Sequence, residues 1–487
     1  MSFHYDLLIR NALIIDGTRR PRYTGDIGVC GGRIAEIGQL KQAHAECEID
    51  AQGKIAAPGF IDAHTHDDRL LGSDPAMMPK VSQGVTSVII GNCGISLAPL
   101  VAPSPPPPLD LIDDGGAFRF PDFASFLEEL EGRPAATNVA CLVGHTTLRV
   151  AAMSRLDRAA TPEETARMQA MAREALAAGA IGLSTGTYYP PAAHATTEEI
   201  IAVARPLKDY GGRYVTHMRN EDDRIVESME ETFRIGRELG VPVIISHHKV
   251  QGPHNHGRSS ETLALLRQAG ERQSVCLDCY PYAASSTILR ADRIALSSRI
   301  LITWSKPHPE FAGMELAKAA ERLGVSQEQA VPMLSPAGGI YFSMDETDVQ
   351  RILQFDETMV GSDGLPHDVK PHPRLWGTFP RVLGHYCRDL KLFPLETAIY
   401  KMTGLTARNF GLRERGLLQP GYWADITLFD AEEIGDAASF DAPTQAARGI
   451  DSVIVNGVPV WRGGRSTGAR PGRLLRAGAA AERTAGG

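Results

Sequence analysis

Metal-binding side chains stand at the ends of several apolar, strand-like stretches of this chain. They are His64 and His66 in Pro58-Gly-Phe-Ile-Asp-Ala-His-Thr-His66, Cys93 after residues 85–92, His217 after residues 212–216, His247 after residues 241–246, and Asp363 after residues 359–362. Each alone is more often structural: a small buried cysteine, a capping aspartate or a histidine satisfied by a neighbour. Chance rarely places all of them at strand ends, so the pattern indicates one shared site.

The residue types in this pattern suit zinc. One thiolate and two imidazoles, from Cys93, His217 and His247, leave a fourth position for water, as a catalytic zinc site requires. Bound Zn²⁺ lowers the pKa of such a water to roughly 7. Asp363 then suits a general base that carries the proton to a leaving group.

His64 and His66 form the second half of the pattern. Successive strand side chains point to opposite faces, so these two histidines share a face if the stretch is a strand. Together with Asp363 they supply ligands for a second metal, bridged by Cys93. Because thiolate is a soft ligand, we expect the site of Cys93, His217 and His247 to bind its metal more tightly.

The elements that position these residues alternate between strand-like and helix-like stretches. Eight strand candidates end near His66, Cys93, residues 144–145, residues 184–186, His217, His247, residues 279–280 and Asp363. This alternation predicts a parallel sheet with crossover helices. Eight such units over about 350 residues favour an α/β fold of the (β/α)8 TIM type, whose active sites form where the strands end.

We expect this barrel to span residues 58–414, with an insertion at about 285–345 after the seventh strand that we interpret as a lid. Short strands separated by glycine-containing turns occupy residues 1–57 and recur in residues 415–467, so both chain ends are predicted to pair into one small β-sandwich-like domain. Residues 468–487 hold few large apolar side chains and are predicted to be a mobile tail.

The composition is that of an ordinary globular protein. The 487 residues are 43% hydrophobic and 22% charged, with a net charge of −8 and no dense basic block, which argues against nucleic acid as a partner. No signal peptide and no membrane-spanning segment is apparent. The seven scattered cysteines fit a reduced, cytoplasmic protein, and the sequence does not indicate an oligomeric state.

Several motifs together resemble the amidohydrolase superfamily, specifically its N-acyl-D-amino-acid deacylase (D-aminoacylase) branch, over nearly the whole chain. They are His64-Thr-His66, Gly91-Asn-Cys-Gly94, His217-Met-Arg-Asn220, Ser246-His-His-Lys249 and Gly361-Ser-Asp-Gly364. The resemblance implies that Cys93, His217 and His247 bind zinc and that Asp363 is the catalytic acid/base. It also implies that a second metal at His64 and His66 is weak or absent.

A missing lysine supports this branch. Relatives similar to dihydroorotase and hydantoinase bridge two metals with a carbamylated lysine on the fourth strand. No lysine lies between Lys80 and Lys208, so that bridge cannot form here, and Cys93 is its natural replacement.

Candidate substrate-binding residues follow the ligands. By strand alternation Lys249 faces as His247 does and Arg219 as His217 does, so either can meet a substrate carboxylate, although an ion pair at a loop end explains Arg219 equally well. The resemblance implies that Lys249 and Tyr280 contact the α-carboxylate, with Arg374 as a third candidate. Tyr189 is expected to donate to the reacting carbonyl.

A further candidate segment, residues 282–290, includes Ser286 and resembles a substrate-pocket segment of the family. Arg290, or Arg293 three residues on, suits an acidic side chain, which favours N-acyl-D-glutamate over apolar substrates. A solvated arginine at the edge of an insertion is an equally ordinary interpretation.

The sequence thus predicts a zinc-dependent hydrolase that splits the amide bond of small N-acyl-D-amino acids. D-stereochemistry follows from the resemblance alone. The alternatives are hydrolysis of cyclic amides or imides on the same fold and a non-enzymatic scaffold. The complete ligand set argues against the scaffold.

Overall fold

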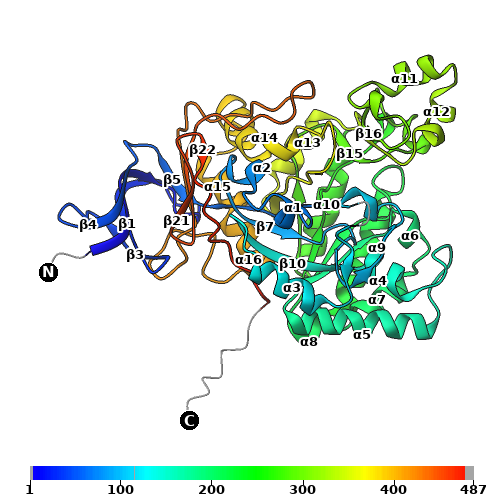
Figure 1. The fold of residues 1–487 in the computed structure, drawn as a ribbon, viewed down its shortest axis with the longest axis horizontal. Coiled ribbons are helices and arrows are strands. Elements are labelled where there is room, and N and C mark those ends of the chain that lie inside the picture. Colours follow the sequence, from blue (N-terminus) through cyan, green and yellow to red (C-terminus); the bar gives the residue numbers. More distant parts are fainter. Residues whose placement is uncertain (1–3, 114–115, 478–487) are drawn as a thin grey trace, which may run out of the picture.

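Eight parallel strands form the centre of the structure, a computed structural model that describes residues 4–113 and 116–477 (Figure 1). The strands are β6 (Phe60–Asp62), β7 (Val85–Ile90), β10 (Asn138–Gly144), β11 (Gly182–Gly186), β12 (Arg213–His217), β13 (Val243–Ile245), β14 (Val275–Cys279) and β18 (Thr358–Val360). They are hydrogen-bonded in the order β18-β14-β13-β12-β11-β10-β7-β6. The predicted (β/α)8 barrel is confirmed.

The barrel closes between its first and last strands just beyond their ends. Thr65 and Gly364 form an isolated parallel bridge, and the Asp363 N–H donates to the His64 carbonyl at 2.8 Å. Inside, apolar side chains from successive strands, among them Ile61, Leu142 and Val215, pack into one buried cluster. Since the interior is filled, the polar residues gather at the carboxyl ends of the strands.

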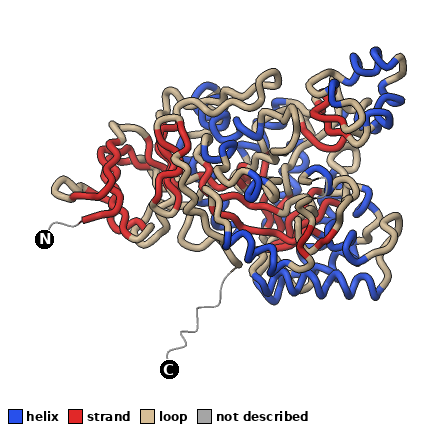
Figure 2. The backbone as a smooth tube through the Cα atoms, in the orientation of Figure 1, coloured by secondary structure: helices blue, strands red, loops and turns tan. Residues whose placement is uncertain are grey.

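Helices surround the barrel (Figure 2). They are α1 (Leu70–Ser73), α2 (Met78–Val81), α3 (Phe123–Gly132), α4 (His145–Ala152), α5 (Pro162–Ala178), α6 (Pro190–Ala193), α7 (Thr197–Ala204), α8 (Leu207–Tyr210), α9 (Ile225–Leu239), α10 (Ser259–Gly270), α13 (Glu346–Gln354), α14 (Arg374–Arg381), the π-helix η5 (Val382–Asp389), α15 (Leu395–Met402) and α16 (Gly404–Phe410). Helix α5 begins with a capping box, in which the Thr161 hydroxyl accepts from the Glu164 N–H and the Glu164 carboxylate accepts from the Thr161 N–H. None of the described helices is both long and apolar enough to cross a bilayer.

Both ends of the chain build one nine-stranded sheet, which confirms the predicted shared β domain. Its strands are β1 (His4–Ile14), β2 (Tyr23–Cys30), β3 (Arg33–Gly38), β4 (His44–Asp50), β5 (Ile55–Pro58), β19 (Ile426–Phe429), β20 (Ile450–Val455), β21 (Val458–Arg462) and β22 (Arg465–Ser466). The two ends meet where β5 and β19 pair antiparallel, with Ile55 opposite Phe429. In Figure 1 this sheet lies to the left of the barrel.

The insertion follows the seventh barrel strand, as predicted. It contains a three-stranded sheet and two helices, which project from the barrel at the upper right of Figure 1. Its elements are β15 (Ser285–Ile288), β16 (Ile300–Ser305), α11 (Leu316–Leu323), α12 (Gln327–Leu334) and β17 (Ala337–Tyr341). Strand β15 leads directly away from the site and lines part of it.

The expectation of a mobile tail is wrong for residues 468–477. This segment runs along the base of the barrel, where the Val139 N–H donates to the Arg473 carbonyl at 3.0 Å and the Leu475 N–H donates to the Val139 carbonyl at 2.7 Å. The Asn138 side chain accepts from the Arg473 N–H and donates to Asp425 of the β domain. Backbone pairing, which needs no large side chains, holds the segment in place. The remaining residues of the predicted tail, 478–487, lie outside the described part.

A chain that ends at residue 467 should therefore be less stable than the full chain. It loses four backbone hydrogen bonds made by residues 472, 473, 475 and 477 with the barrel. At about 0.5–1.5 kcal/mol each, the free energy of unfolding should fall by about 2–4 kcal/mol. Urea unfolding followed by fluorescence measures this loss. A chain that ends at residue 477 keeps all four bonds and is the matched control; equal midpoints for both truncations would refute the docking.

Candidate metal centre

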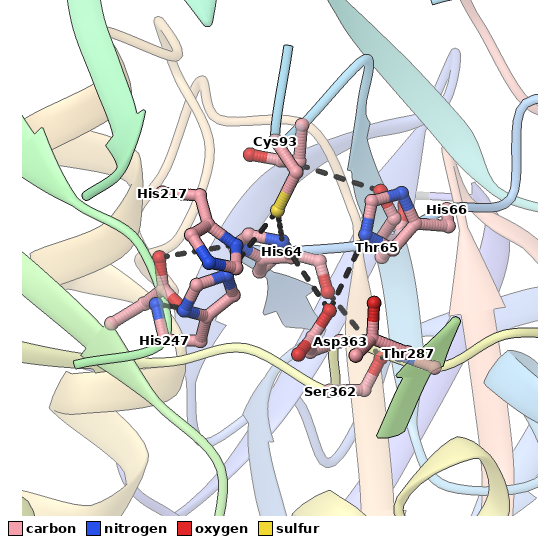
Figure 3. Close-up of polar contacts among 12 residues, drawn as sticks. His64, Thr65, His66, Cys93, His217, His247, Thr287, Ser362 and Asp363 are labelled. Atoms are coloured by element: carbon pink, nitrogen blue, oxygen red, sulfur yellow. Dashed lines mark hydrogen bonds and ion pairs between the residues drawn. The ribbon is translucent and has the colours of Figure 1, made fainter. Parts of the chain in front are cut away.

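Five of the six ligands expected from the sequence meet in one buried cluster (Figure 3). Cys93 Sγ lies 3.3 Å from His64 Nε2 and 3.2 Å from His247 Nε2. Asp363 Oδ1 lies 3.5 Å from His64 Nε2 and 3.3 Å from His66 Nε2. Cys93 thus stands between the two predicted halves of the site, where a bridging ligand belongs.

His217, the sixth expected ligand, stands beside His247 with their ring centroids 4.4 Å apart. It is 4% exposed, and neither of its ring nitrogens has a hydrogen-bond partner. A buried polar group without a partner costs free energy unless a ligand satisfies it. A metal ion held by His217, His247 and Cys93 accounts for this side chain, and the donor set of one thiol and two imidazoles fits Zn²⁺.

The backbone is left-handed at three residues of the cluster. The φ angles are 55° at Cys93, 34° at His247 and 50° at Asp363. Residues with side chains other than Asn or Asp rarely adopt this region, and the cost of order 1–3 kcal/mol is typical of functional sites. The sharp turn after each strand directs these side chains inward over the barrel instead of along the strand.

Burial sets the protonation of the ligands. It lowers the pKa of His64 to about 3 and that of His217 well below its ordinary value, so both imidazoles are neutral with a lone pair to donate. It also raises the pKa of the Cys93 thiol well above its ordinary value. Without a cation the thiol therefore carries its proton at neutral pH.

Asp363 is ionised despite its burial. Burial opposes the charge, but the Arg374 guanidinium, with Nη1 2.9 Å from Asp363 Oδ2, and the nearby His247 hold the pKa of this carboxyl well below its ordinary value. A carboxylate beside the ligand cluster is the state that a general base requires.

Glu221 is a buried site residue that the sequence reasoning missed. Its carboxylate accepts from Lys249 Nζ at 2.7 Å and from Gln251 Nε2 at 2.7 Å, and Oε1 lies 3.2 Å from His247 Nδ1. A carboxylate behind a metal-binding imidazole fixes the orientation of its ring. The available signal was weak: an acidic residue four positions after His217 is common on any surface.

The predicted substrate residues divide between the pocket and the layer behind it. Lys249, Tyr189 and Ser286 line the pocket beside the ligands. Tyr280 and Arg374 are fully buried and do not line it; the Arg374 guanidinium stacks 4.5 Å from the Tyr280 ring centroid behind Asp363. Contact of Tyr280 and Arg374 with a substrate stays a prediction.

Arg290 and Arg219 are placed away from the pocket. Arg290 Nε donates to Asp292 at 2.9 Å, at the outer edge of the insertion. Arg219 forms two hydrogen bonds with Glu231, at 3.0 and 2.9 Å, so the alternative of a loop-end ion pair is correct. In both cases a neighbouring carboxylate holds the guanidinium outside the pocket.

Arg293 instead points into the pocket. Its guanidinium, on a side chain 5% exposed, donates to the Tyr188 hydroxyl at 2.7 Å and to the Gln251 side-chain oxygen. Among residues 4–113 and 116–477, no carboxylate forms an ion pair with it. Arg293 is thus a buried cation that lines the pocket without a paired charge.

The pocket itself is narrow. The Tyr189 hydroxyl and Thr287 Oγ1, 3.0 Å apart, meet across it, and its free volume is about 20 Å³, which is room for about one water. Binding of a larger molecule therefore requires β15, which carries Thr287, to move outward.

A buried lysine lies under the ligand cluster. Lys80 Nζ donates to Asp62 at 2.8 Å and to the Ser362 hydroxyl at 2.8 Å, and lies 3.3 Å from Asp67. The other oxygen of Asp62 accepts from the Ser362 N–H at 2.7 Å. This group joins the segment that carries His64 and His66 to the segment that carries Asp363.

Comparison with known proteins places this arrangement in context. A model of the amidohydrolase family matches residues 47–303 and 305–461. D-aminoacylase of Alcaligenes xylosoxydans xylosoxydans is 59% identical over 471 residues, 97% of each chain. N-acyl-D-aspartate deacylase of the same organism is 53% identical over 474 residues, which are 97% of this chain and 95% of the relative.

Two solved structures are also similar. One is of D-aminoacylase, described for one-metal activation and second-metal attenuation of its binuclear centre; it matches with a TM-score of 0.96 at 59% identity and covers 97% of this chain and 100% of that one. The other is N-acyl-D-glutamate deacylase from Bordetella bronchiseptica, complexed with zinc and a phosphonate mimic of the tetrahedral intermediate. Its TM-score is 0.93 at 46% identity, and it covers 98% of this chain and 100% of that one.

Metal binding should release a proton from the Cys93 thiol. Burial raises the pKa of this thiol, so the metal-free protein holds the proton near neutral pH, whereas a metal ligand must be a thiolate. The apparent affinity for Zn²⁺ should therefore rise with pH, by about tenfold per pH unit while one proton is released. Calorimetry in two buffers of different ionisation enthalpy counts the protons. Cys279→Ala, another buried cysteine, should release the same number as the wild type; no release from the wild type would contradict this assignment.

Proposed function

This chain belongs to the amidohydrolase family, and we propose that it is a zinc-dependent enzyme that hydrolyses N-acyl-D-amino acids to a carboxylic acid and a free D-amino acid. The observation that carries the proposal is the buried cluster of Cys93, His217 and His247 beside an ionised Asp363. D-stereochemistry is supported by the relatives alone. The complete ligand set argues against a scaffold without activity.

The metal is proposed to lie between three ligands, with a weaker second site beside it. Zinc held by Cys93, His217 and His247 supplies a Lewis acid that lowers the pKa of water to about 7 and polarises the acyl carbonyl. His64 and His66 complete a second site, which we propose is weak or empty during turnover, in agreement with the attenuating second metal described for D-aminoacylase.

Asp363 is proposed to carry the proton. Its carboxylate takes a proton from the attacking water and returns it to the amine nitrogen as the carbon–nitrogen bond breaks. Arg374 keeps it ionised and fixes its position. Burial raises the pKa of Tyr189 well above its ordinary value, so its hydroxyl keeps its proton and is suited to donate a hydrogen bond to the developing oxyanion.

The seven cysteines support a reducing location. All of them are free in the structure, including the Cys93 thiol that the site requires. We propose that the protein works in the cytoplasm with a small molecule as its partner.

Zinc content and turnover of a small panel test the proposal. We expect about one zinc per chain and release of free amino acid from N-acetyl-D-Asp, N-acetyl-D-Glu and N-acetyl-D-Leu, but not from N-acetyl-L-Glu. Cys93→Ala should lose both zinc and activity. Asp363→Asn should keep the zinc and lower kcat by about 10²–10⁴-fold, because it removes the acid/base. Zinc with turnover of cyclic amides only would favour the ring-opening alternative; no zinc and no turnover would refute the enzyme.

The charge of the pocket favours an acidic substrate side chain. Near the site, Lys249 is paired with Glu221, Arg374 with Asp363 and Arg290 with Asp292, whereas Arg293 pairs with no carboxylate of the described chain. A substrate carboxylate offsets the cost of burying an unpaired guanidinium. We therefore propose that N-acyl-D-aspartate or N-acyl-D-glutamate is preferred over apolar substrates and that Arg293 holds the side-chain carboxylate.

Replacing Arg293 should change selectivity more than activity. In Arg293→Met, kcat/KM for N-acetyl-D-Asp and N-acetyl-D-Glu should fall by at least about 30-fold, or about 2 kcal/mol, because a buried charge pair is lost. The value for N-acetyl-D-Leu should stay within about threefold of the wild type. Arg290→Met, three residues away and bound to Asp292, is the matched control. If Arg293→Met lowers all three substrates equally, Arg293 binds the α-carboxylate that they share.

A further inference from the structure

A second cavity opens beside the metal pocket and is not used by the reaction as described. We call it the vestibule. It has a volume of about 600 Å³ and lies between the polyproline loop (residues 105–107), Trp304 and Pro336 of the insertion, and Val369 of the loop after β18. The volume is ample for an acyl chain of ten or more heavy atoms, whereas an acetyl group needs almost none of it.

Leu111 connects the vestibule to the metal pocket. This residue ends the short helix η1 (Leu109–Leu111), is 5% exposed and lines both cavities. A group bound at the metal therefore has to pass only one side chain to reach the vestibule.

The metal pocket is polarised toward this passage. Its cations, Lys249 and Arg293, stand on the side of β13 and the insertion, whereas Leu111 and Leu365 form an apolar wall with Ile95 on the other side. An N-acyl amino acid has its carboxylates on one side of the amide bond and its acyl chain on the other. If the cations hold the amino-acid half, the acyl half points along the apolar wall toward Leu111.

The walls of the vestibule are suited to an apolar group. Val369 is 66% exposed, Trp304 is half-buried, and Pro107 is exposed, so apolar surface is open to contact. The charged side chains at its rim include both signs, and Arg69 there pairs with Asp113 at 3.0 Å. The vestibule thus lacks the excess of cations that would attract the carboxylate half of the substrate.

We propose that the vestibule is an acyl subsite that accepts extended apolar acyl groups, above all those that end in an aromatic ring. The proposal rests on the proposed function, since it assigns the acyl half of the same substrate. The ring packs on Trp304 and the prolines, and contact with Val369 excludes water from its edge. The acyl group thereby contributes to binding independently of the amino-acid side chain.

Matched substrates test the subsite. N-acetyl and N-(4-phenylbutanoyl) derivatives of D-Asp and of D-Leu share the same leaving amines and alkyl-substituted carbonyls. For the wild type, we expect kcat/KM to be at least tenfold higher for the phenylbutanoyl member of each pair. Trp304→Ala and the milder Val369→Ser should each reduce this ratio at least fivefold, with the N-acetyl values within about twofold of the wild type.

The control variant is Val458→Ser. Val458 is also an exposed valine, at 41%, but lies on β21 of the small β domain, so the substitution should leave the ratio unchanged. A wild-type ratio of one or less overturns the subsite. So does a Trp304→Ala variant that changes the D-Asp to D-Leu preference in place of the acyl preference.

Equilibrium binding separates this inference from the proposed function. Calorimetry of zinc-loaded protein should show 4-phenylbutanoate binding at least tenfold more tightly than acetate, and Trp304→Ala should abolish the difference. If no N-acyl-D-amino acid is hydrolysed but this difference persists, the proposed function fails and the subsite stands. Equal binding of the two acids overturns the subsite whatever the activity.

Discussion

The position of the active site depends on one buried cation. Lys80 is fully buried and has two carboxylates, Asp62 and Asp67, to offset the cost of its burial. Through Asp62 and Ser362 it joins the end of the first barrel strand to the loop after the eighth, where backbone pairing is reduced to a single bridge. The histidines of the first strand and the catalytic aspartate of the eighth are therefore held in register by charge at the one seam of the barrel where the hydrogen-bond ladder is weakest.

Charge is divided equally carefully around the metal centre. The ligands are neutral imidazoles and a protonated thiol, so a metal ion is the charge that this cluster accommodates. Behind them, Glu221 neutralises Lys249 and Arg374 neutralises Asp363. The left-handed backbone at Cys93, His247 and Asp363 turns the ligands inward, and packing of the barrel sustains that strain. Chemistry is concentrated where the chain is both strained and dry.

The barrel, the shared β domain and the ligand cluster were predictable because each has a residue signature: alternation of strands and helices, and metal-type residues at strand ends. Arg219 was misplaced because strand alternation holds only within a strand, and β12 ends at His217. Glu221 was missed because a buried acid looks like a surface acid in a sequence. The tail was misjudged because backbone hydrogen bonds bind it, and these depend on no particular side chain. Arg293 and Arg290 were equivalent candidates until Asp292 was seen to occupy only one of them.

The sheet shared by both chain ends also dictates an order of synthesis. Strand β5 pairs with β19, which leaves the ribosome about 370 residues later, roughly 20–75 s at 5–20 residues per second. During that interval the N-terminal strands present an open β edge with no partner from their own chain, the kind of edge that invites pairing between nascent chains. The barrel in between can close first, but the domain beside it stays half-built until the end. Yield in a cell should thus depend on how well chaperones shield the first 58 residues, far from any residue that takes part in catalysis.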